Sequence, residues 1–360
     1  MKQKFEALTG IRAIAAIMIF VYHNRKFWRN TFPEMANRLL NEFHIGVSLF
    51  FVLSGFLITY TYFNSFQNNS LNQYKNYITL RLARIYPVYL LIILAKYIFT
   101  KFPTGIETFL NISLLKGYSE KYLLTGIPQT WSLCVELTFY AIAPLIFWSI
   151  YKNGMLKSFL YTAITCIALV FVGIELKFLN LNPYGILSDF KFVSIATFQG
   201  RFIEFWAGII LALMILEKIK IPFEIKNKTL LGFLSIIVFL FIFTLFQKQI
   251  WTHSIETIPG VLLHNILFPF TILLFYWGLI TEKTYTSQIL GSNPLQILGY
   301  SSFIFYLIHI NFVNNIVWDK IHHFKDRNFV FLWLIAIAGY YLIEKPIYNL
   351  VKKWVKRVKS

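Results

Sequence analysis

Long apolar runs recur along the whole of this 360-residue sequence, and they restrict its possible folds more than any other feature. About 20 apolar residues are what an α-helix needs to cross the hydrocarbon core of a bilayer. Ten such runs can be recognised, at residues 8–24, 43–63, 82–100, 131–150, 158–175, 198–217, 229–247, 260–281, 296–317 and 329–350. The sequence therefore predicts an all-α polytopic membrane protein of about ten transmembrane helices.

The composition agrees with this class of protein. Hydrophobic residues make up 57% of the chain and charged residues only 14%, with a mean hydropathy of +0.59. A soluble domain of this length needs more polar surface. The net charge of +18 would suggest nucleic acid in a soluble protein, but the basic residues lie mostly in short connections between the apolar runs. We therefore expect no nucleic-acid partner, and the lipid bilayer is the predicted surrounding.

An even number of spans places both termini on one side of the membrane. Lys and Arg are modestly biased toward the side of the N-terminus, chiefly through the loop "EKIKIPFEIKNK" and the tail "KKWVKRVKS". The positive-inside rule then predicts that both termini are cytoplasmic. We expect one transmembrane domain over residues 1–350 and a basic cytoplasmic tail over 351–360. The cysteines, Cys134 and Cys166, lie in apolar runs without metal-ligand spacing, so we predict no metal site.

The first apolar run, "LTGIRAIAAIMIFVYHN", contains two ionisable residues, Arg12 and His23. They are eleven residues apart, which is about 16 Å along a helix and close to three turns, so they project from one face. In the predicted orientation Arg12 lies near the cytosolic end and His23 in the outer half. One interpretation is that Arg12 reaches the lipid headgroups and His23 marks the outer interface. The other is a functional site, since ionisable groups inside a membrane are costly.

The third run opens with "RLARIYPVYLL", in which Arg81 and Arg84 share a helix face. Both are predicted at the inner entrance of the span. They are either a positive-inside anchor or an anion site, because guanidinium groups grip phosphates in a fixed geometry. With Arg12 also at the inner end, three arginines could converge on one polyphosphate.

The fourth run begins "WSLCVELTFY" and carries a carboxylate inside the apolar layer. Ser132, Glu136 and Tyr140 follow at intervals of four residues and line one helix face. A buried Glu136 needs a partner or becomes neutral. It is either a structural partner of a basic residue on another helix, or it orients a histidine or takes part in acid–base chemistry.

Several later features have simple structural interpretations. The small residues within "GVSLFFVLSGFLIT" predict close helix packing. Arg201 and Glu204 are three residues apart and predict an internal ion pair. His309, in the predicted outer half of the ninth span, fits a hydrogen-bonded structural group, and "YLIEKP" around Glu344 fits the end or anchor of the tenth span.

Taken together and in this order, these motifs resemble those of the membrane acyltransferase family 3, the O-acyltransferases that modify bacterial cell-surface carbohydrates. The resemblance covers essentially the whole chain. It rests on the Arg12-to-His23 spacing, "FFVLSGFLIT", the pair Arg81 and Arg84, "WSLCVELTFY", "RFIEFWAG", "SSFIFYLIH" and "YLIEKP". The opening differs slightly, since Thr9 stands where the family often has aspartate.

The resemblance implies a multi-pass enzyme of the inner (cytoplasmic) membrane that takes acetyl-CoA or another acyl-CoA from the cytosol. It needs no permanently bound cofactor and acylates, most simply O-acetylates, a carbohydrate hydroxyl on the outer side. The acceptor remains open between lipopolysaccharide O-antigen, exopolysaccharide, capsule, peptidoglycan and small glycosides. The roles it implies are catalysis for His23 and Glu136 and acyl-CoA binding for Arg12, Arg81 and Arg84. Our hypothesis for the mechanism adds an outer pocket shaped by Trp131, Ser132 and His309.

Two other classes of protein would also have many membrane spans. A transporter or flippase for lipid-linked glycans would also carry intramembrane charges. It does not explain an inner arginine group opposite an outer histidine and glutamate. A receptor or scaffold without chemistry would not need the buried ionisable residues.

Overall fold

The structure is a computed structural model that describes residues 5–25, 31–67, 70–100, 102–103, 105–219, 224–249, 252–310 and 327–357. Within these ranges the chain is helical, with one isolated antiparallel bridge between Ser119 and Ile186, and the predicted all-α class is confirmed. The longer helices are α1 (Glu6–Asn24), α2 (Glu34–Asn41), α3 (Gly46–Tyr62), α4 (Leu71–Phe99), α5 (Gly105–Ile112), α6 (Trp131–Asn153), α7 (Met155–Phe178), α9 (Phe198–Ile215), α10 (Lys228–Leu245), α12 (Phe268–Thr281), α14 (Asn293–Ile308), α16 (Arg327–Gly339) and α17 (Lys345–Arg357). Shorter ones are η2 (Glu42–Ile45), η3 (Phe63–Phe66), η4 (Lys116–Tyr118), η5 (Pro128–Thr130), α8 (Phe190–Ala196), η6 (Ser254–Glu256), α11 (Ile258–Leu262), η7 (Leu263–Leu267), α13 (Tyr285–Leu290) and η8 (Tyr340–Glu344).

Nine helical segments of the described chain are long and apolar enough to cross a membrane. They correspond to nine of the ten predicted spans, which confirms a polytopic membrane protein. The predicted span 296–317 is represented by α14, which has 16 residues and ends at Ile308. Residues 311–317 of that prediction lie outside the described residues.

Helix α4 extends well beyond the predicted span. It begins at Leu71 rather than near residue 82 and has 29 residues. The polar stretch 71–81 contains no glycine or proline, so nothing stops the helix there. As a consequence, Arg81 and Arg84 lie inside a continuous helix and not at its first turn.

Two of the spans contain a single π-helical turn. One is η7, between α11 and α12, and it holds the fully buried His264. The other is η8, between α16 and α17, and it holds the buried Glu344. Single π-turns within α-helices occur frequently at functional sites, because they turn side chains out of the α-helical register. Beyond η8 the helix continues as α17 to Arg357, so the basic residues after position 350 begin as helix.

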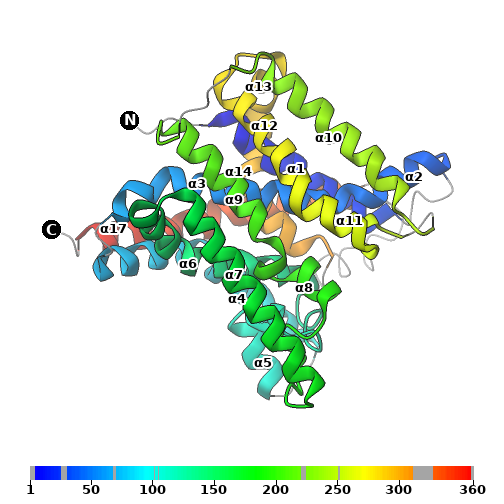
Figure 1. Cartoon of the computed structure of the whole chain (residues 1–360), viewed down its shortest axis with the longest axis vertical. Coiled ribbons are helices and arrows are strands. Elements are labelled where there is room, and N and C mark those ends of the chain that lie inside the picture. Colours follow the sequence, from blue (N-terminus) through cyan, green and yellow to red (C-terminus); the bar gives the residue numbers. More distant parts are fainter. Residues whose placement is uncertain are drawn as a thin grey trace. The chain divides into compact units, whose positions relative to one another are not determined.

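The chain divides into two compact units, Met1–Tyr60 with Arg201–Ser302, and Thr61–Gly200 with Phe303–Ser360. The first unit packs α1, α3, α9, α10 and α12 around an apolar core. Helices α10 and α12 lie side by side in it, as Figure 1 shows for the segments coloured yellow-green and yellow. Leu53, Phe56, Phe243 and Phe268 are among the buried side chains of this core.

Close helix contacts in the first unit depend on glycine. A Cβ on Gly208 of α9 would lie 2.1 Å from the carbonyl oxygen of Val52 of α3, and one on Gly55 would lie 2.3 Å from that of Phe205. Both distances are far below van der Waals contact, so only glycine allows the two backbones to approach this closely. The packing role predicted for small residues in "GVSLFFVLSGFLIT" is confirmed at Gly55.

The second unit contains α4, α6, α7, α8 and α17. Helix α17 packs against α4, and α6 packs against α7. Tyr89 of α4 and Phe139 and Phe147 of α6 are fully buried. This unit carries most of the motifs that the sequence singles out after residue 80.

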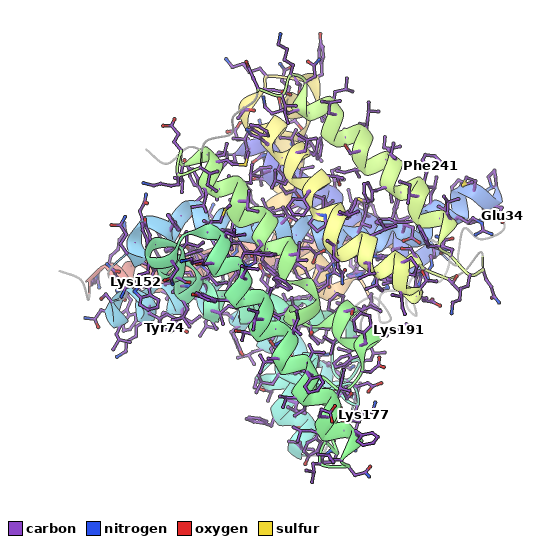
Figure 2. The ribbon with its side chains drawn as sticks, in the orientation of Figure 1. Glu34, Tyr74, Lys152, Lys177, Lys191 and Phe241 are labelled. Atoms are coloured by element: carbon purple, nitrogen blue, oxygen red, sulfur yellow. The ribbon has the colours of Figure 1, made fainter. Side chains whose placement is uncertain are left out.

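The outward faces of several spans are apolar. Helix α7 exposes Leu160, Ile164, Ile167 and Phe171, and Phe241 of α10 points away from its neighbours in Figure 2. Rows of exposed leucine, isoleucine and phenylalanine on such helices are suited to contact with lipid tails.

Candidate active site

Arg81 lies among tyrosines in the second unit. Its Nη2 donates a hydrogen bond of 2.9 Å to the hydroxyl of Tyr62. Its guanidinium lies over the Tyr62 ring at 5.1 Å from the centroid and near the Tyr140 ring at 6.0 Å. Aromatic faces hold a guanidinium in place without neutralising its charge. Arg81 is therefore fixed in position as a cation.

Two donors at this place have no acceptor among the described residues. They are Nε of Arg81 and the hydroxyl of Tyr77, and both atoms are buried. Tyr77 precedes Arg81 by one helical turn and packs against the ring of Tyr62. Buried hydrogen-bond donors normally have an acceptor. Two donors without one, next to the positive charge of Arg81, therefore indicate a site for an anion.

Arg84 lies one turn further along α4. Its Nε is 4.0 Å from Oε1 of Glu344, and its side chain is 34% exposed, whereas that of Glu344 is 5% exposed. Glu344 reaches this position from the π-turn η8. The sequence predicted "YLIEKP" only as the end or anchor of a span, and the contact of its Glu344 with Arg84 was not predicted.

A stripe of polar residues runs along α6. The hydroxyl of Tyr140 donates a hydrogen bond to Glu136, four residues earlier. Since the Tyr140 ring also lies near the guanidinium of Arg81, the carboxylate of Glu136 belongs to the surroundings of the arginines within this unit. The predicted face of Ser132, Glu136 and Tyr140 is present as a continuous helix.

Ser132 belongs to a second polar group of this unit, near the start of α6. Its Oγ and the hydroxyl of Tyr306 are 2.7 Å apart, and the Tyr306 hydroxyl donates to the carbonyl of Gln129 at 2.8 Å. His309 is buried, with its Nδ1 2.7 Å from the carbonyl oxygen of Tyr306. The structure thus brings Ser132 and His309 to the same residue, Tyr306. Trp131 instead packs against the apolar group around Leu187, Phe192 and Val193.

Arg12 and His23 lie on α1, in the first unit. Arg12 is half-buried, and His23 is exposed near the end of α1. The ring of His23 contacts that of Tyr22, with centroids 4.7 Å apart. The sequence prediction that Arg12 joins Arg81 and Arg84, and that His23 joins Glu136, links residues of different units and stays a prediction.

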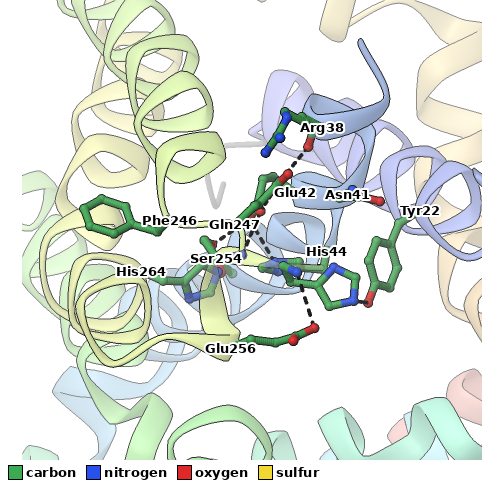
Figure 3. A network of polar contacts seen from close by, with 12 residues as sticks. Tyr22, Arg38, Asn41, Glu42, His44, Phe246, Gln247, Ser254, Glu256 and His264 are labelled. Atoms are coloured by element: carbon green, nitrogen blue, oxygen red, sulfur yellow. Dashed lines mark hydrogen bonds and ion pairs between the residues drawn. The ribbon is translucent and has the colours of Figure 1, made fainter. Parts of the chain in front are cut away.

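Beside the end of α1 lies a polar cluster that the sequence analysis did not identify. It joins η2, which follows α2, to the segment 247–256 and to His264 of η7 (Figure 3). Glu42 is fully buried and accepts hydrogen bonds from Nε2 of Gln247 at 2.6 Å, and from Oγ and the backbone N–H of Ser254 at 2.7 and 2.9 Å. Nε2 of His44 is 3.2 Å from Oε2 of Glu42.

Three imidazole rings meet in this cluster. The ring of His44 lies 5.8 Å from that of His253 and 5.2 Å from that of His264. Burial, together with the neighbouring His44 and Arg25, lowers the pKa of His253 to about 4, so its imidazole is neutral at pH 7. The only sequence signal for the cluster is the short motif Glu42-x-His44, because its other members come from segments more than 200 residues away.

Arg201 and Glu204 form the internal ion pair predicted from the sequence. Both are buried, and the guanidinium meets the carboxylate through two hydrogen bonds of 2.6 and 2.8 Å. Nη2 of Arg201 also donates to Oγ of Ser48 at 3.1 Å. All of this lies within the first unit. Among the described residues, no group of three or more His, Cys, Asp or Glu side chains could hold a metal ion.

Comparison with known proteins shows what this chain is similar to. The sequence model of a family described as an acyltransferase domain matches residues 5–348. A Staphylococcus aureus (strain COL) protein named as an O-acetyltransferase is 25% identical over 94% of this chain and 56% of its own length. The chain thus spans about half the length of the curated relatives it matches most fully.

Two further relatives match in part. The peptidoglycan O-acetyltransferase of Listeria monocytogenes serovar 1/2a is 27% identical over 42% of this chain and 26% of its own length. A Haemophilus influenzae protein is 29% identical over 60% of this chain and 92% of its own length. No solved structure matches the chain.

Proposed function

Because the chain belongs to the acyltransferase domain family, we propose that it is an integral-membrane O-acyltransferase. It moves an acyl group, in the simplest case acetyl, from cytosolic acyl-CoA to a hydroxyl of a cell-surface or exported carbohydrate. The name of the Listeria relative makes peptidoglycan the first acceptor to test, beside O-antigen, exopolysaccharide and capsule. The membrane is the inner (cytoplasmic) membrane, with both termini in the cytosol.

The observation that supports this proposal best is the pair of arginines on α4, together with the neighbouring hydrogen-bond donors that have no acceptor among the described residues. Coenzyme A carries several phosphate groups, and arginine binds phosphate through paired, charge-assisted hydrogen bonds. Nε of Arg81 and the Tyr77 hydroxyl are donors without an acceptor among the described residues. Arg84 is partly exposed and only 4.0 Å from Glu344, so it can exchange this weak contact for a phosphate. Arg12 would add a third cation from the first unit.

On the acceptor side, His23 is the residue that acts on the acyl group. An imidazole can act as a general base or as a nucleophile that carries the acyl group briefly. Its exposure at the end of α1 supports this role, because a reacting side chain has to be reached by substrate. Glu136 serves the same reaction through Tyr140, which links its carboxylate to Arg81. Trp131, Ser132 and His309 would line the acceptor pocket.

Donor binding can be measured directly. The purified protein in lipid nanodiscs is titrated with a non-hydrolysable acetyl-CoA analogue, and Arg81→Ala/Arg84→Ala is compared with Lys75→Ala. Lys75 is an exposed cation on the same helix and serves as the matched control. Loss of hydrogen bonds to charged phosphates is worth about 1.5–3 kcal/mol each, so we expect Kd to rise by about tenfold or more in the arginine variant.

Equal affinity in the arginine variant and in the control would mean that the arginines are only a topology anchor. The reaction itself is followed through the release of free coenzyme A on addition of a carbohydrate acceptor. A flippase would release none. The substitution His23→Ala should abolish acceptor-dependent release, and full activity in this variant would remove His23 from the mechanism.

A further inference from the structure

The cluster around Glu42 contains an unusually well-held carboxylate. Glu42 is fully buried, and both of its oxygens accept hydrogen bonds from Gln247 and Ser254. A buried, ionised carboxylate is stable only when paired and hydrogen-bonded, and here those partners are present. Glu42 is therefore a fixed negative charge that directs one oxygen toward His44.

His44 is the neighbour that can make chemical use of this charge. Its Nε2 is 3.2 Å from Oε2 of Glu42, and its side chain keeps 11% of its surface exposed, whereas that of Glu42 keeps none. A carboxylate beside one ring nitrogen fixes the tautomer of the imidazole and stabilises the imidazolium once it forms. The other nitrogen then keeps its lone pair and can accept a proton.

The other two histidines of the cluster lack this combination. His264 is fully buried and its ring nitrogens face Ser48 and Asn265, at 3.4 and 2.9 Å. His253 has a pKa of about 4, which makes it too weak a base for work near pH 7. Among the described histidines of this cluster, His44 alone combines an ion-pair contact to a carboxylate with a partly accessible side chain.

His44 also lies close to the residue proposed to react with the acyl group. The ring of Tyr22 contacts His23 at 4.7 Å and His44 at 5.6 Å between centroids. The two imidazoles therefore flank one aromatic ring, and their separation cannot exceed the sum of these two distances. The end of α1, η2 and the segment 247–256 all lie at the predicted outer ends of their spans, where the carbohydrate acceptor arrives.

Resting on the proposed function, we propose that Glu42 and His44 form a second acid–base pair of the acyltransferase, which deprotonates the acceptor hydroxyl while His23 carries the acyl group. In the first half-reaction a ring nitrogen of His23 attacks the thioester carbon. The C–S bond breaks, an N–C bond forms, and the thiolate takes the proton released by the imidazole. In the second, His44 takes the proton of the acceptor hydroxyl and the oxygen attacks the acyl carbon. The N–C bond to His23 breaks as the O–C bond of the ester forms, and the freed His23 nitrogen receives the proton that His44 took, which restores both imidazoles.

A purely structural role makes a different prediction. Glu42 also fastens the segment 247–254 to η2, so a structural network would affect both half-reactions and the stability equally. The proposed acid–base role instead predicts that loss of His44 impairs the transfer to the acceptor and leaves the acylation of His23 intact. Only a residue that acts on the acceptor can be lost without loss of the acylation of His23.

The test compares His44→Gln with His253→Gln, the same substitution at a ring of the same cluster that forms no ion pair with a carboxylate among the described residues. Each variant receives acetyl-CoA without acceptor, and we measure one equivalent of released coenzyme A and the acetyl mass on the intact protein. Carbohydrate acceptor is then added and product is measured. We expect His44→Gln to keep the release and the acetyl mass but to slow transfer by about a hundredfold or more, as the loss of a general base does. His253→Gln should keep both steps.

The outcomes are distinct. Normal transfer in His44→Gln, or loss of both half-reactions in a variant with an unchanged melting temperature, would overturn the acid–base role. If His44→Gln does not fold, Glu42→Gln, which keeps the size of the side chain, must give the same split or the role is rejected. Absence of coenzyme A release from the unsubstituted protein with every donor tried would instead overturn the proposed function, independently of His44.

Discussion

At the scale of single residues, the buried arginines of this chain differ in how completely their donors are used. Arg201 is saturated by Glu204 and Ser48. Arg81 keeps a buried donor without an acceptor among the described residues. In a membrane helix both cations are costly, so the saturated one is a structural element and the unsaturated one indicates a ligand.

The structural role of Arg201 leads to a stability prediction. Arg201→Met leaves the carboxylate of Glu204 buried without its partner, which should lower the free energy of unfolding by about 3–5 kcal/mol. The double variant Arg201→Met/Glu204→Leu removes both charges and should recover most of this loss. Thermal unfolding in one detergent measures all three proteins, and a double variant less stable than Arg201→Met would contradict the interpretation.

Lys116, in the connection between α5 and α6, predicts a dependence of stability on pH. It is fully buried, and its Nζ donates to the carbonyls of Thr125 and Ile127. Burial lowers its pKa from 10.5 to about 7. The unfolded chain therefore binds more protons between pH 7 and 10.5, and stability should rise with pH across this window. Lys116→Met should flatten the rise in melting temperature, and an unchanged slope would rule Lys116 out as its origin.

At the scale of elements, helix ends and helix contacts are set by groups distant in sequence. Glu282, directly after α12, accepts hydrogen bonds from the backbone N–H groups of Lys228 and Thr229 at 2.7 and 2.8 Å. These N–H groups begin α10 and have no partner within that helix. A carboxylate at the end of one helix therefore caps the start of its neighbour, and it connects the two helices that lie side by side in Figure 1.

This cap predicts a loss of stability in acid. Burial would raise the pKa of Glu282, but the hydrogen bonds from Thr229 and the backbone, with the charge of Lys228, lower it below its usual 4.5. Its stabilising effect is thus complete above pH 4.5 and is lost as the pH falls through the lowered value. Glu282→Gln should cost about 1 kcal/mol at pH 7, as the loss of a cap does. It should cost less at pH 3, and an equal loss of melting temperature at both would refute the charged cap.

At the scale of the whole molecule, connections between the apolar helices of the described chain carry exposed charges. Two exposed lysines, Lys121 and Lys226, lie in connections that are predicted on opposite sides of the membrane. Cys134 and Cys166 are both buried, so the protein has little background reactivity toward thiol reagents. These features make the predicted orientation measurable.

The orientation test uses single introduced cysteines. Lys121→Cys should react with a membrane-impermeant maleimide in intact cells, and Lys226→Cys should react only after permeabilisation. The prediction follows from cytoplasmic termini and the order of the spans. The reverse labelling pattern would invert the orientation, and with it the assignment of the His23 end of α1 to the acceptor side.

The class of the fold could be predicted from the amino-acid sequence, because apolar runs of membrane-spanning length leave helices as the only way to satisfy the backbone. The sequence also predicted the local pairs along single helices, such as Arg201 with Glu204 and Tyr140 with Glu136, because their spacing follows from 3.6 residues per turn. The early start of α4 at Leu71 was not predicted, because hydropathy indicates the part of a helix that lies in the membrane and not the residue at which the helix begins.

The contacts between groups distant in sequence could not be predicted, and they were found in the packed structure. The capping of α10 by Glu282, the contact of Arg84 with Glu344 and the cluster of Glu42 with His44 join segments 54 to more than 200 residues apart in the chain. No periodicity encodes such contacts, because they depend on how helices pack and on π-turns that redirect individual side chains. Sequence alone therefore identified His23 and the arginines as candidates, whereas the pair of Glu42 and His44, which shares the neighbour Tyr22 with His23, became visible only once the helices were assembled.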